Sequence, residues 1–183
     1  MKMSGDEIRL IQRAKKGDPA AFAEIYDRHQ PAIYRYIFYR VGDAATAEDL
    51  TSEVFVRLVE RIDRFTYRGR PLLAWLYTIA RNLVADHHRR AGRPSPLPLD
   101  ERLTASAADP EEALARRLTQ QRLIAAIAYL TEDQRQVLLL RFVEGLDNET
   151  VARMLGKSVG AVKALQHRAL AALRRILERD GGP

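Results

Sequence analysis

The 183-residue sequence has no cysteine, which excludes disulfide bonds, thiolate metal sites and a thiol nucleophile. It has no apolar run near the ~20 residues that span a membrane, and its start, MKMSGDEIRLIQRAKKGD, lacks the apolar stretch of a signal peptide. No segment alternates with the period of two that is typical of strands. We therefore expect a cytoplasmic, all-α protein without membrane insertion.

Enzyme motifs are also missing from the sequence. The histidines at positions 29, 87, 88 and 167 are scattered, and there is no HExxH pair, Walker A loop or GxSxG turn. We therefore predict no catalytic residue, no metal site and no cofactor, and an enzyme is the least favoured class of function.

Charge divides the chain into three parts. Residues 1–90 contain 16 basic and 12 acidic side chains, residues 91–112 contain 2 and 5, and residues 113–183 contain 12 and 7. The overall formal charge is +6. An excess of positive charge favours a polyanionic partner such as nucleic acid, and here it lies on two separate segments.

The acidic segment predicts a linker. Residues 91–112 hold four prolines and few large apolar side chains, so they can neither form a long helix nor bury a core. We therefore predict two small helical domains, residues 1–90 and 113–183, joined by a flexible acidic linker over residues 91–112.

Apolar residues recur at helical spacing in both predicted domains. In the first domain the predicted helices cover residues 8–16, 19–42, 46–62 and 72–90. In the second, Leu114, Leu118, Ile124, Ile127 and Leu130 lie on one periodic face of a leading helix. Thr131 is then the predicted N-cap of a helix that ends at Gly145, and two further helices cover residues 148–155 and 158–177.

The last two helices are typical of a helix-turn-helix. Val151, Ala152, Leu155, Val162 and Leu165 are expected to fill the angle between them. Ser158 caps the second helix, and Lys163, Ala164, His167 and Arg168 lie on its other side, where a recognition helix meets base edges and phosphates. A helical hairpin with a solvated basic face remains the alternative.

A second group of residues precedes the linker. Arg89 and Arg90 can hold a phosphate backbone, and Tyr67 or Tyr77 can stack on an unpaired base, which is a combination typical of single-strand binding. Trp75 shares a helical face with Leu76, Ile79 and Leu83, and such a residue is more often part of the core than a stacking platform.

A third group is acidic. Glu48, Asp49 and Glu53 interleave with Leu50, Val54 and Phe55. A partner with basic residues beside an apolar groove would fit this face. Taken alone, however, the pattern is better explained by the start of a solvated helix.

Together these segments resemble the sigma-70 family of bacterial RNA polymerase sigma factors. AEDLTSEVFVRL resembles region 2.2, RFTYRGRPLLAWLYTIARNLVADHHRR resembles regions 2.3 and 2.4, and LTEDQRQVLLLRFVEGLDNETVARMLGKSVGAVKALQHRALAALRR resembles region 4. Their order and the short linker resemble the extracytoplasmic-function (ECF) group, which keeps domains two and four. The resemblance implies a factor that binds core RNA polymerase, recognises the minus-thirty-five and minus-ten promoter elements, and melts DNA.

The resemblance also implies residue roles and partners. The matched positions are Asp49, Leu50, Glu53 and Phe55 for the clamp helices of the largest polymerase subunit; Asn82, Trp75, Arg68 and residues 67–71 for a flipped minus-ten base; and Ser158, Lys163, Ala164, His167 and Arg168 for the minus-thirty-five element. The polymerase flap and an anti-sigma factor are further implied partners, and the linker resembles the family's connector through the RNA exit path. Thr51 and Ser52 stand where the family often has glutamine, and Ala164 and His167 leave the base readout open.

A free-standing helix-turn-helix regulator is the rival hypothesis. It explains residues 113–183 equally well, with the first domain acting as a sensor or in dimerisation. It gives no role to the cluster at residues 75–90 or to the acidic face at residues 48–55.

Overall fold

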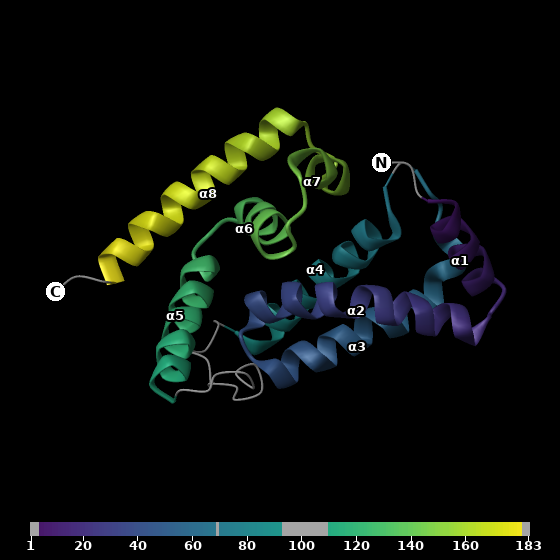
Figure 1. The fold of residues 1–183 in the computed structure, drawn as a ribbon, viewed down its shortest axis with the longest axis horizontal. Coiled ribbons are helices and arrows are strands. Elements are labelled where there is room, and N and C mark those ends of the chain that lie inside the picture. Colours follow the sequence, from purple (N-terminus) through teal and green to yellow (C-terminus); the bar gives the residue numbers. More distant parts are fainter. Residues whose placement is uncertain (1–3, 69, 93–109, 181–183) are drawn as a thin grey trace.

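The structure is a computed structural model that describes residues 4–68, 70–92 and 110–180. Every regular element in these ranges is a helix, and no strand occurs among them. The predicted all-α class is therefore confirmed. Figure 1 shows the helices in two groups, α1 to α4 and α5 to α8, which we call the N-lobe and the C-lobe.

The N-lobe is a bundle of long helices. It comprises α1 (Gly5–Lys15), α2 (Pro19–Val41), α3 (Ala44–Arg61), the 3₁₀ turn η1 (Ile62–Arg64) and α4 (Leu72–Ala91). The central helix α2 packs against α1, α3 and α4 (Figure 1). Side-chain oxygens of Ser4, Asp18 and Asp43 accept hydrogen bonds from backbone N–H groups at the starts of α1, α2 and α3, which satisfies donors that a helix leaves open.

The core of the N-lobe is formed where α2, α3 and α4 face one another. Its largest fully buried side chains include Ile25, Ile33, Tyr36, Ile37, Val54, Leu58, Leu72, Leu76 and Val84. Burying one such side chain contributes about 1.5–3 kcal/mol, so this core fixes the helices as a frame for the residues at their ends.

The C-lobe is built from shorter pieces around one long helix. It comprises α5 (Pro110–Ala128), α6 (Glu132–Leu138), the π-helical turn η3 (Leu139–Val143), α7 (Asn148–Leu155) and α8 (Val159–Asp180). The predicted N-cap is confirmed, because the hydroxyl of Thr131 accepts from the N–H of Gln134 while the Gln134 side chain accepts from the N–H of Thr131. Helix α8 packs against α5, α6 and α7.

Helix α5 departs from the sequence prediction at its beginning. It starts at Pro110, inside the predicted linker of residues 91–112, of which residues 93–109 lie outside the described residues. Leu114 and Leu118 are 55% and 48% exposed, whereas Ile124 and Ile127 are buried. The predicted apolar face is therefore buried only in the second half of α5, because the first half extends beyond α6 and α8 (Figure 1).

The two lobes touch through α2, which contacts both α5 and η3 of the C-lobe. Among the described residues, no helix is long and apolar enough to cross a membrane. In the same part of the chain, no group of three or more His, Asp or Glu side chains is placed to hold a metal ion.

Candidate nucleic-acid interface

The predicted helix-turn-helix is formed by α7 and α8. Asp147 caps α7 by accepting a hydrogen bond of 2.7 Å from the N–H of Thr150. Gly156 ends α7 at a φ of 65°, a left-handed conformation that suits glycine. Ser158 accepts from the N–H of Ala161 at 3.1 Å, as expected of a hydroxyl cap.

The angle between the two helices is filled as predicted. Val151, Ala152 and Val162 are buried, with Ala152 4% exposed. Leu155 and Leu165 are partly buried at the same junction. A small side chain at position 152 allows the helices to cross closely, so α8 is held at a fixed angle to the rest of the C-lobe.

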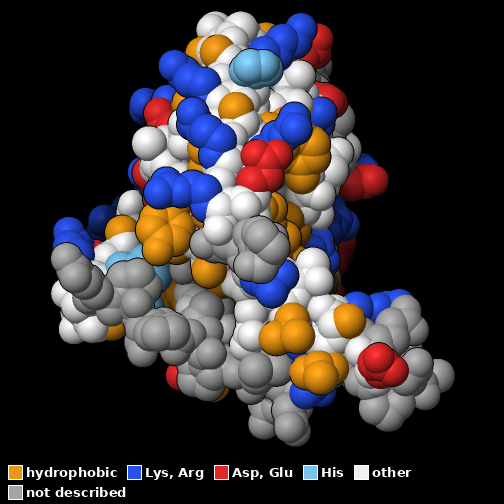
Figure 2. Space-filling view, turned by 90° about the vertical axis from the view of Figure 1, so that its left-hand side faces the viewer, with side chains coloured by type: hydrophobic (Ala, Val, Ile, Leu, Met, Phe, Trp, Pro, Cys, Tyr) orange, Lys and Arg blue, Asp and Glu red, His pale blue; other side chains and the backbone are white. Residues whose placement is uncertain are grey.

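The outer side of α8 carries the predicted minus-thirty-five residues. Ser158, Lys163, Ala164, His167 and Arg168 are all exposed. Within the described part of the chain, Lys163, His167 and Arg168 make no ion pair, so their donors are open to phosphates and base edges. In Figure 2, basic side chains are spread over the upper part of the face shown, the level at which α8 lies in Figure 1.

A cavity of about 580 Å³ opens between η1 and the start of α4. Phe65, Arg68, Arg70 and Trp75 are among the residues that line it, and we call it the loop cavity. Trp75 is half-buried with its ring centroid 5.3 Å from that of Phe65, so it serves both as an edge of the core and as a wall of the cavity. A site of this size with an aromatic wall and arginines can receive a base.

The remaining predicted minus-ten residues lie outside the walls of the loop cavity. Tyr67 is 40% exposed on the loop itself. Asn82 is exposed on α4, one turn beyond Thr78, which lines the cavity. Arg89 and Arg90 are exposed at the end of α4, where Arg89 pairs with Asp86. Tyr67 therefore lies beside the cavity, while the other three residues lie further along α4.

Tyr77 does not present a stacking surface, which corrects the prediction for this residue. It is 6% exposed, and its ring meets the Tyr36 ring edge-on with centroids 4.9 Å apart. Burial raises the pKa of the Tyr77 hydroxyl, and that hydroxyl has no hydrogen-bond partner. The reason is its place on α4, where position 77 faces α2 and the C-lobe.

The acidic face of α3 is also present, with one correction. Asp49 is exposed, Leu50 is partly buried, and Glu53 accepts a hydrogen bond of 3.0 Å from Arg57. Phe55, predicted to face the polymerase, is only 7% exposed and packs edge-on against Tyr26 at 4.8 Å.

Phe55 is buried because it follows the inward side of α3 together with Val54 and Leu58. The apolar side chains on the outward side are instead Val56 and Val59, which are 49% and 52% exposed. Val56 lies three residues after Glu53 and Val59 three residues after Val56, so helical spacing makes each the neighbour of the one before and could have identified them.

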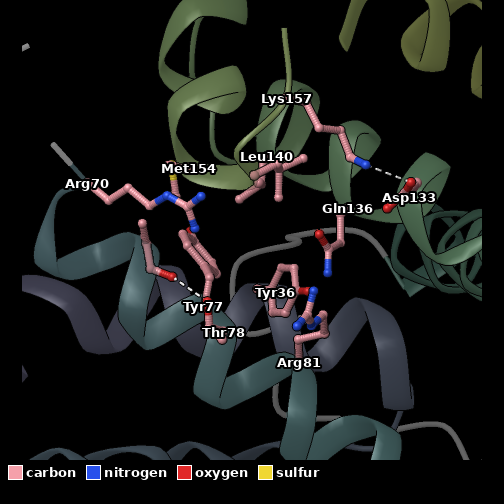
Figure 3. Close-up of a pocket in the computed structure, with 12 residues that line it drawn as sticks. Tyr36, Arg70, Tyr77, Thr78, Arg81, Asp133, Gln136, Leu140, Met154 and Lys157 are labelled. Carbon is pink, nitrogen blue, oxygen red and sulfur yellow. Dashed lines mark hydrogen bonds and ion pairs between the residues drawn. The ribbon is translucent and has the colours of Figure 1, made fainter. Parts of the chain in front are cut away.

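A second cavity, of about 200 Å³, lies between the lobes, where the sequence predicted no site. Figure 3 shows Arg70, Tyr77 and Arg81 on the N-lobe side and Leu140 and Met154 among the residues on the C-lobe side. Within the described residues, neither Arg70 nor Arg81 has a carboxylate partner. We call this the interlobe cavity.

Two ion pairs cross between the lobes beside this cavity. Arg35 donates two hydrogen bonds to Glu144, at 3.1 and 2.7 Å, and the proximity of Glu144 raises the pKa of Arg35. Arg40 donates to Glu132 at 2.6 Å and to the Tyr36 hydroxyl at 2.6 Å. Both pairs join α2 to the C-lobe.

Comparison with known proteins places both lobes in the same family. Residues 25–94 match the family model Sigma-70 region 2, and residues 120–173 match Sigma-70, region 4. The chain is 44% identical over 175 residues to the ECF RNA polymerase sigma factor BldN of Streptomyces coelicolor, covering 94% of this chain and 66% of BldN. It is 37% identical over 182 residues to the ECF RNA polymerase sigma factor SigD of Mycobacterium tuberculosis, covering 95% of this chain and 85% of SigD.

The fold is similar to that of two solved proteins. CnrH, solved in complex with the cytosolic domain of CnrY, matches with a TM-score of 0.73 and 26% identity, over 96% of this chain and 99% of CnrH. RpoE of Bartonella quintana, solved with the anti-sigma factor NepR, matches with a TM-score of 0.62 and 23% identity, over 86% of this chain and 96% of RpoE, and supports the fold alone.

Proposed function

This chain belongs to the extracytoplasmic-function group of the sigma-70 family, whose members direct core RNA polymerase to promoters, and we propose that its two lobes divide that work. The C-lobe anchors the minus-thirty-five element through α8, and the N-lobe binds the polymerase and takes up the minus-ten element. One observation carries the proposal: an exposed, unpaired basic face on α8 and an aromatic-walled cavity on the N-lobe occur in one chain. The match of the N-lobe to region 2 disfavours a free-standing regulator.

In the C-lobe, Lys163, His167 and Arg168 enter the major groove. Lysine and arginine bind phosphates or guanine edges, and histidine can donate to a base or a phosphate. Ala164 offers only a methyl group, which suits contact with a thymine methyl. The hydroxyl of Ser158 accepts from the N–H of Ala161 and can donate its own proton to a backbone phosphate at the start of α8.

In the N-lobe, the loop cavity receives a base extruded from the minus-ten element. Extrusion costs a few kcal/mol of stacking and pairing, which Trp75 and Tyr67 offset by stacking. Asn82 can both donate to and accept from a base edge. Arg68, Arg89 and Arg90 hold the phosphates of the separated strand.

The polymerase clamp binds the outward side of α3. Asp49 and Glu53 supply negative charge, and Val56 and Val59 supply the exposed apolar surface next to it. The assignment of Val56 and Val59 replaces that of Phe55. The factor needs to be bound to the polymerase in order to bind a promoter. Its formal charge of +6 is too small to hold duplex DNA at physiological salt by phosphate contacts alone.

We propose residues 91–112 as a connector that lets the lobes separate, with its acidic side chains following the RNA exit path of the polymerase. An inhibitory protein is a further proposed partner. The likeness to CnrH, solved with the cytosolic domain of CnrY, supports it. No reaction is assigned to the chain itself, since the polymerase performs the chemistry.

The test is run-off transcription with purified core polymerase and a promoter library, together with a pull-down of core subunits. Glu53→Arg should abolish both core binding and initiation, because it places a positive charge where the clamp requires a negative one. Asp63→Arg is the matched control, since it makes the same charge change at an exposed site beyond α3. Full core binding by Glu53→Arg would contradict the assignment.

A further inference from the structure

Helix α1 holds both ends of the loop that connects η1 to α4 and lines the loop cavity. At the beginning of this loop, the ammonium group of Lys15 donates a hydrogen bond of 2.6 Å to the carbonyl oxygen of Phe65, the residue that follows η1. At its end, a carboxylate oxygen of Glu7 accepts a hydrogen bond of 3.4 Å from the N–H of Leu72, the first residue of α4. We call these two bonds the α1 brace.

The brace supplies what the loop itself lacks at its two ends. Pro71 is the N-cap of α4 and makes no side-chain hydrogen bond, so the N–H groups of the first turn of α4 need an acceptor from elsewhere. Glu7 provides that acceptor, with a negative charge at the end of the helix that favours it. At the other end, a carbonyl oxygen that follows a helical turn accepts readily from a lysine such as Lys15.

Helix α1 can fix the distance between the two ends because it is itself held in place. Leu10, Ile11 and Ala14 are buried on its inner side, and the helix packs against α2 and η1. Glu7 and Lys15 are eight residues apart, which is about 12 Å along a helix. The helix also lies before residues 25–94, which match the region 2 family model, so the brace comes from outside the matched segment.

The position of Phe65 connects the brace to the wall of the loop cavity. The Phe65 ring lies with its centroid 5.3 Å from that of Trp75, and both side chains line the cavity. A shift of the Phe65 backbone would therefore move one aromatic wall against the other. Because a site selects among similar molecules only when its walls are held firmly, the bond from Lys15 bears on which base the cavity accepts.

We propose that Glu7 and Lys15 are positioning residues, which set the shape of the loop cavity and thereby how strictly it discriminates between extruded minus-ten bases. This inference rests on the proposed function of the cavity. Neither residue lines the cavity, so both act through the loop and not by touching the base. If the brace only stabilised the N-lobe, its loss would affect every promoter alike.

The state of the loop can be followed by fluorescence of the free, full-length chain, because Trp75 is its one tryptophan. Lys15→Met combined with Glu7→Leu should increase acrylamide quenching of Trp75 about twofold or more, since local opening exposes the ring. Lys15→Arg combined with Glu7→Gln keeps a donor and an acceptor and should keep the parental quenching. Lys16→Met combined with Asp27→Leu removes one cation and one carboxylate from exposed positions of the N-lobe and should leave the quenching unchanged.

Discrimination is read from open-complex formation by the holoenzyme on four promoters that differ only in the base taken up by the loop cavity. Loss of the brace should lower the ratio of rates between the preferred base and the next best at least about fivefold, because a displaced wall no longer excludes the wrong base. The same variant should keep the parental ratios on promoters that differ at single minus-thirty-five positions, because α8 reads that element. The Lys15→Arg and Glu7→Gln combination should restore the minus-ten ratio.

The possible outcomes separate positioning from general damage. Lys15→Met alone, at an exposed position, provides the same test if the double change unfolds the N-lobe, which circular dichroism would show. Unchanged quenching without the brace overturns the inference, and so does an equal loss of rate on all four promoters. A parent holoenzyme that opens all four promoters equally instead overturns the proposed function of the cavity, and the inference with it. The quenching of Trp75 would then still report whether α1 holds the loop.

Discussion

The two lobes present their DNA-reading residues in opposite ways. The C-lobe displays Lys163, His167 and Arg168 on the open side of one helix, ready for a groove. The N-lobe places its readers around a cavity, and the same helix buries Tyr77 against the C-lobe. A duplex is read by a convex helix, whereas an extruded base needs a concave site. The form of each surface therefore fits a different step of promoter recognition.

The lobes also differ in how they are stabilised. The N-lobe rests on helices of 23, 18 and 20 residues around one core. The C-lobe includes helices of only 7 and 8 residues, α6 and α7, which are too short to be stable alone. Each of these begins with a side-chain cap, from Thr131 or Asp147. Each also packs against α8.

The largest effect is expected for Asn82, the N-lobe residue proposed to recognise the extruded base. Asn82→Ala should slow open-complex formation by about 10- to 100-fold, because the extruded base loses a donor and an acceptor. Permanganate footprinting of the melted bases measures this, alongside a pull-down that should show unchanged core binding. Gln12→Ala, an exposed amide on α1, is the control. Normal opening by Asn82→Ala would contradict a base-capturing N-lobe.

The next effect concerns the core of the N-lobe and depends on pH. His29 is 9% exposed, its Nε2 has no hydrogen-bond partner, and burial lowers its pKa to about 4. The unfolded chain, with a histidine pKa near 6.5, takes up a proton first as the pH falls. Stability from this residue is therefore complete above pH ~6.5 and is lost progressively down to pH ~4.

Between pH 7.5 and 5 the free energy of unfolding should fall by about 2 kcal/mol because of His29. Urea unfolding at both pH values measures it. His29→Leu, which fills a similar volume without a titrating group, should remove this part of the pH dependence. His167→Leu, at an exposed position in the C-lobe, should leave it in place. The same pH dependence in parent and His29→Leu would show that acid acts elsewhere.

The sequence predicted those parts of the molecule that depend on local chemistry. The caps at Thr131 and Ser158 were both identified, because hydroxyl caps leave local signals in the sequence. Helical periodicity predicted that Val151 and Val162 are buried. The same periodicity predicted that the DNA-contacting residues of α8 are exposed.

Contacts between distant segments could not be predicted in this way. Arg35 and Glu144 are 109 residues apart, and Arg40 and Glu132 are 92 apart, so no periodic signal connects them. Tyr77 was misjudged for the same reason, since it is covered by Tyr36, 41 residues away on α2, and by the C-lobe. Phe55 is a different case. The helical spacing of the residues in α3 could have indicated that Phe55 faces the core and that Val56 faces outward.

The next prediction sharpens the description of α8 as a groove reader. Lys163→Ala should weaken minus-thirty-five binding by about 1–3 kcal/mol, and the loss should concentrate at one base-pair position, because a lysine bound to a base edge discriminates between bases. Binding of the holoenzyme to a set of single-base promoter variants measures it. Arg61→Ala, an exposed cation at the end of α3, should have no such positional effect.

The smallest effect is expected for Arg168, which lies further along α8 than Lys163 and which we assign to a phosphate. A side chain that neutralises one phosphate releases about one counterion, so Arg168→Ala should lower the slope of log affinity against log salt by about one. The loss should be similar for every promoter variant, because phosphates carry no sequence information. Holoenzyme binding at several salt concentrations, in parallel with Lys163→Ala, separates the two roles. A position-specific loss for Arg168→Ala and a uniform one for Lys163→Ala would reverse the assignment while keeping α8 as the reader, and the absence of any effect from both would remove α8 from promoter recognition.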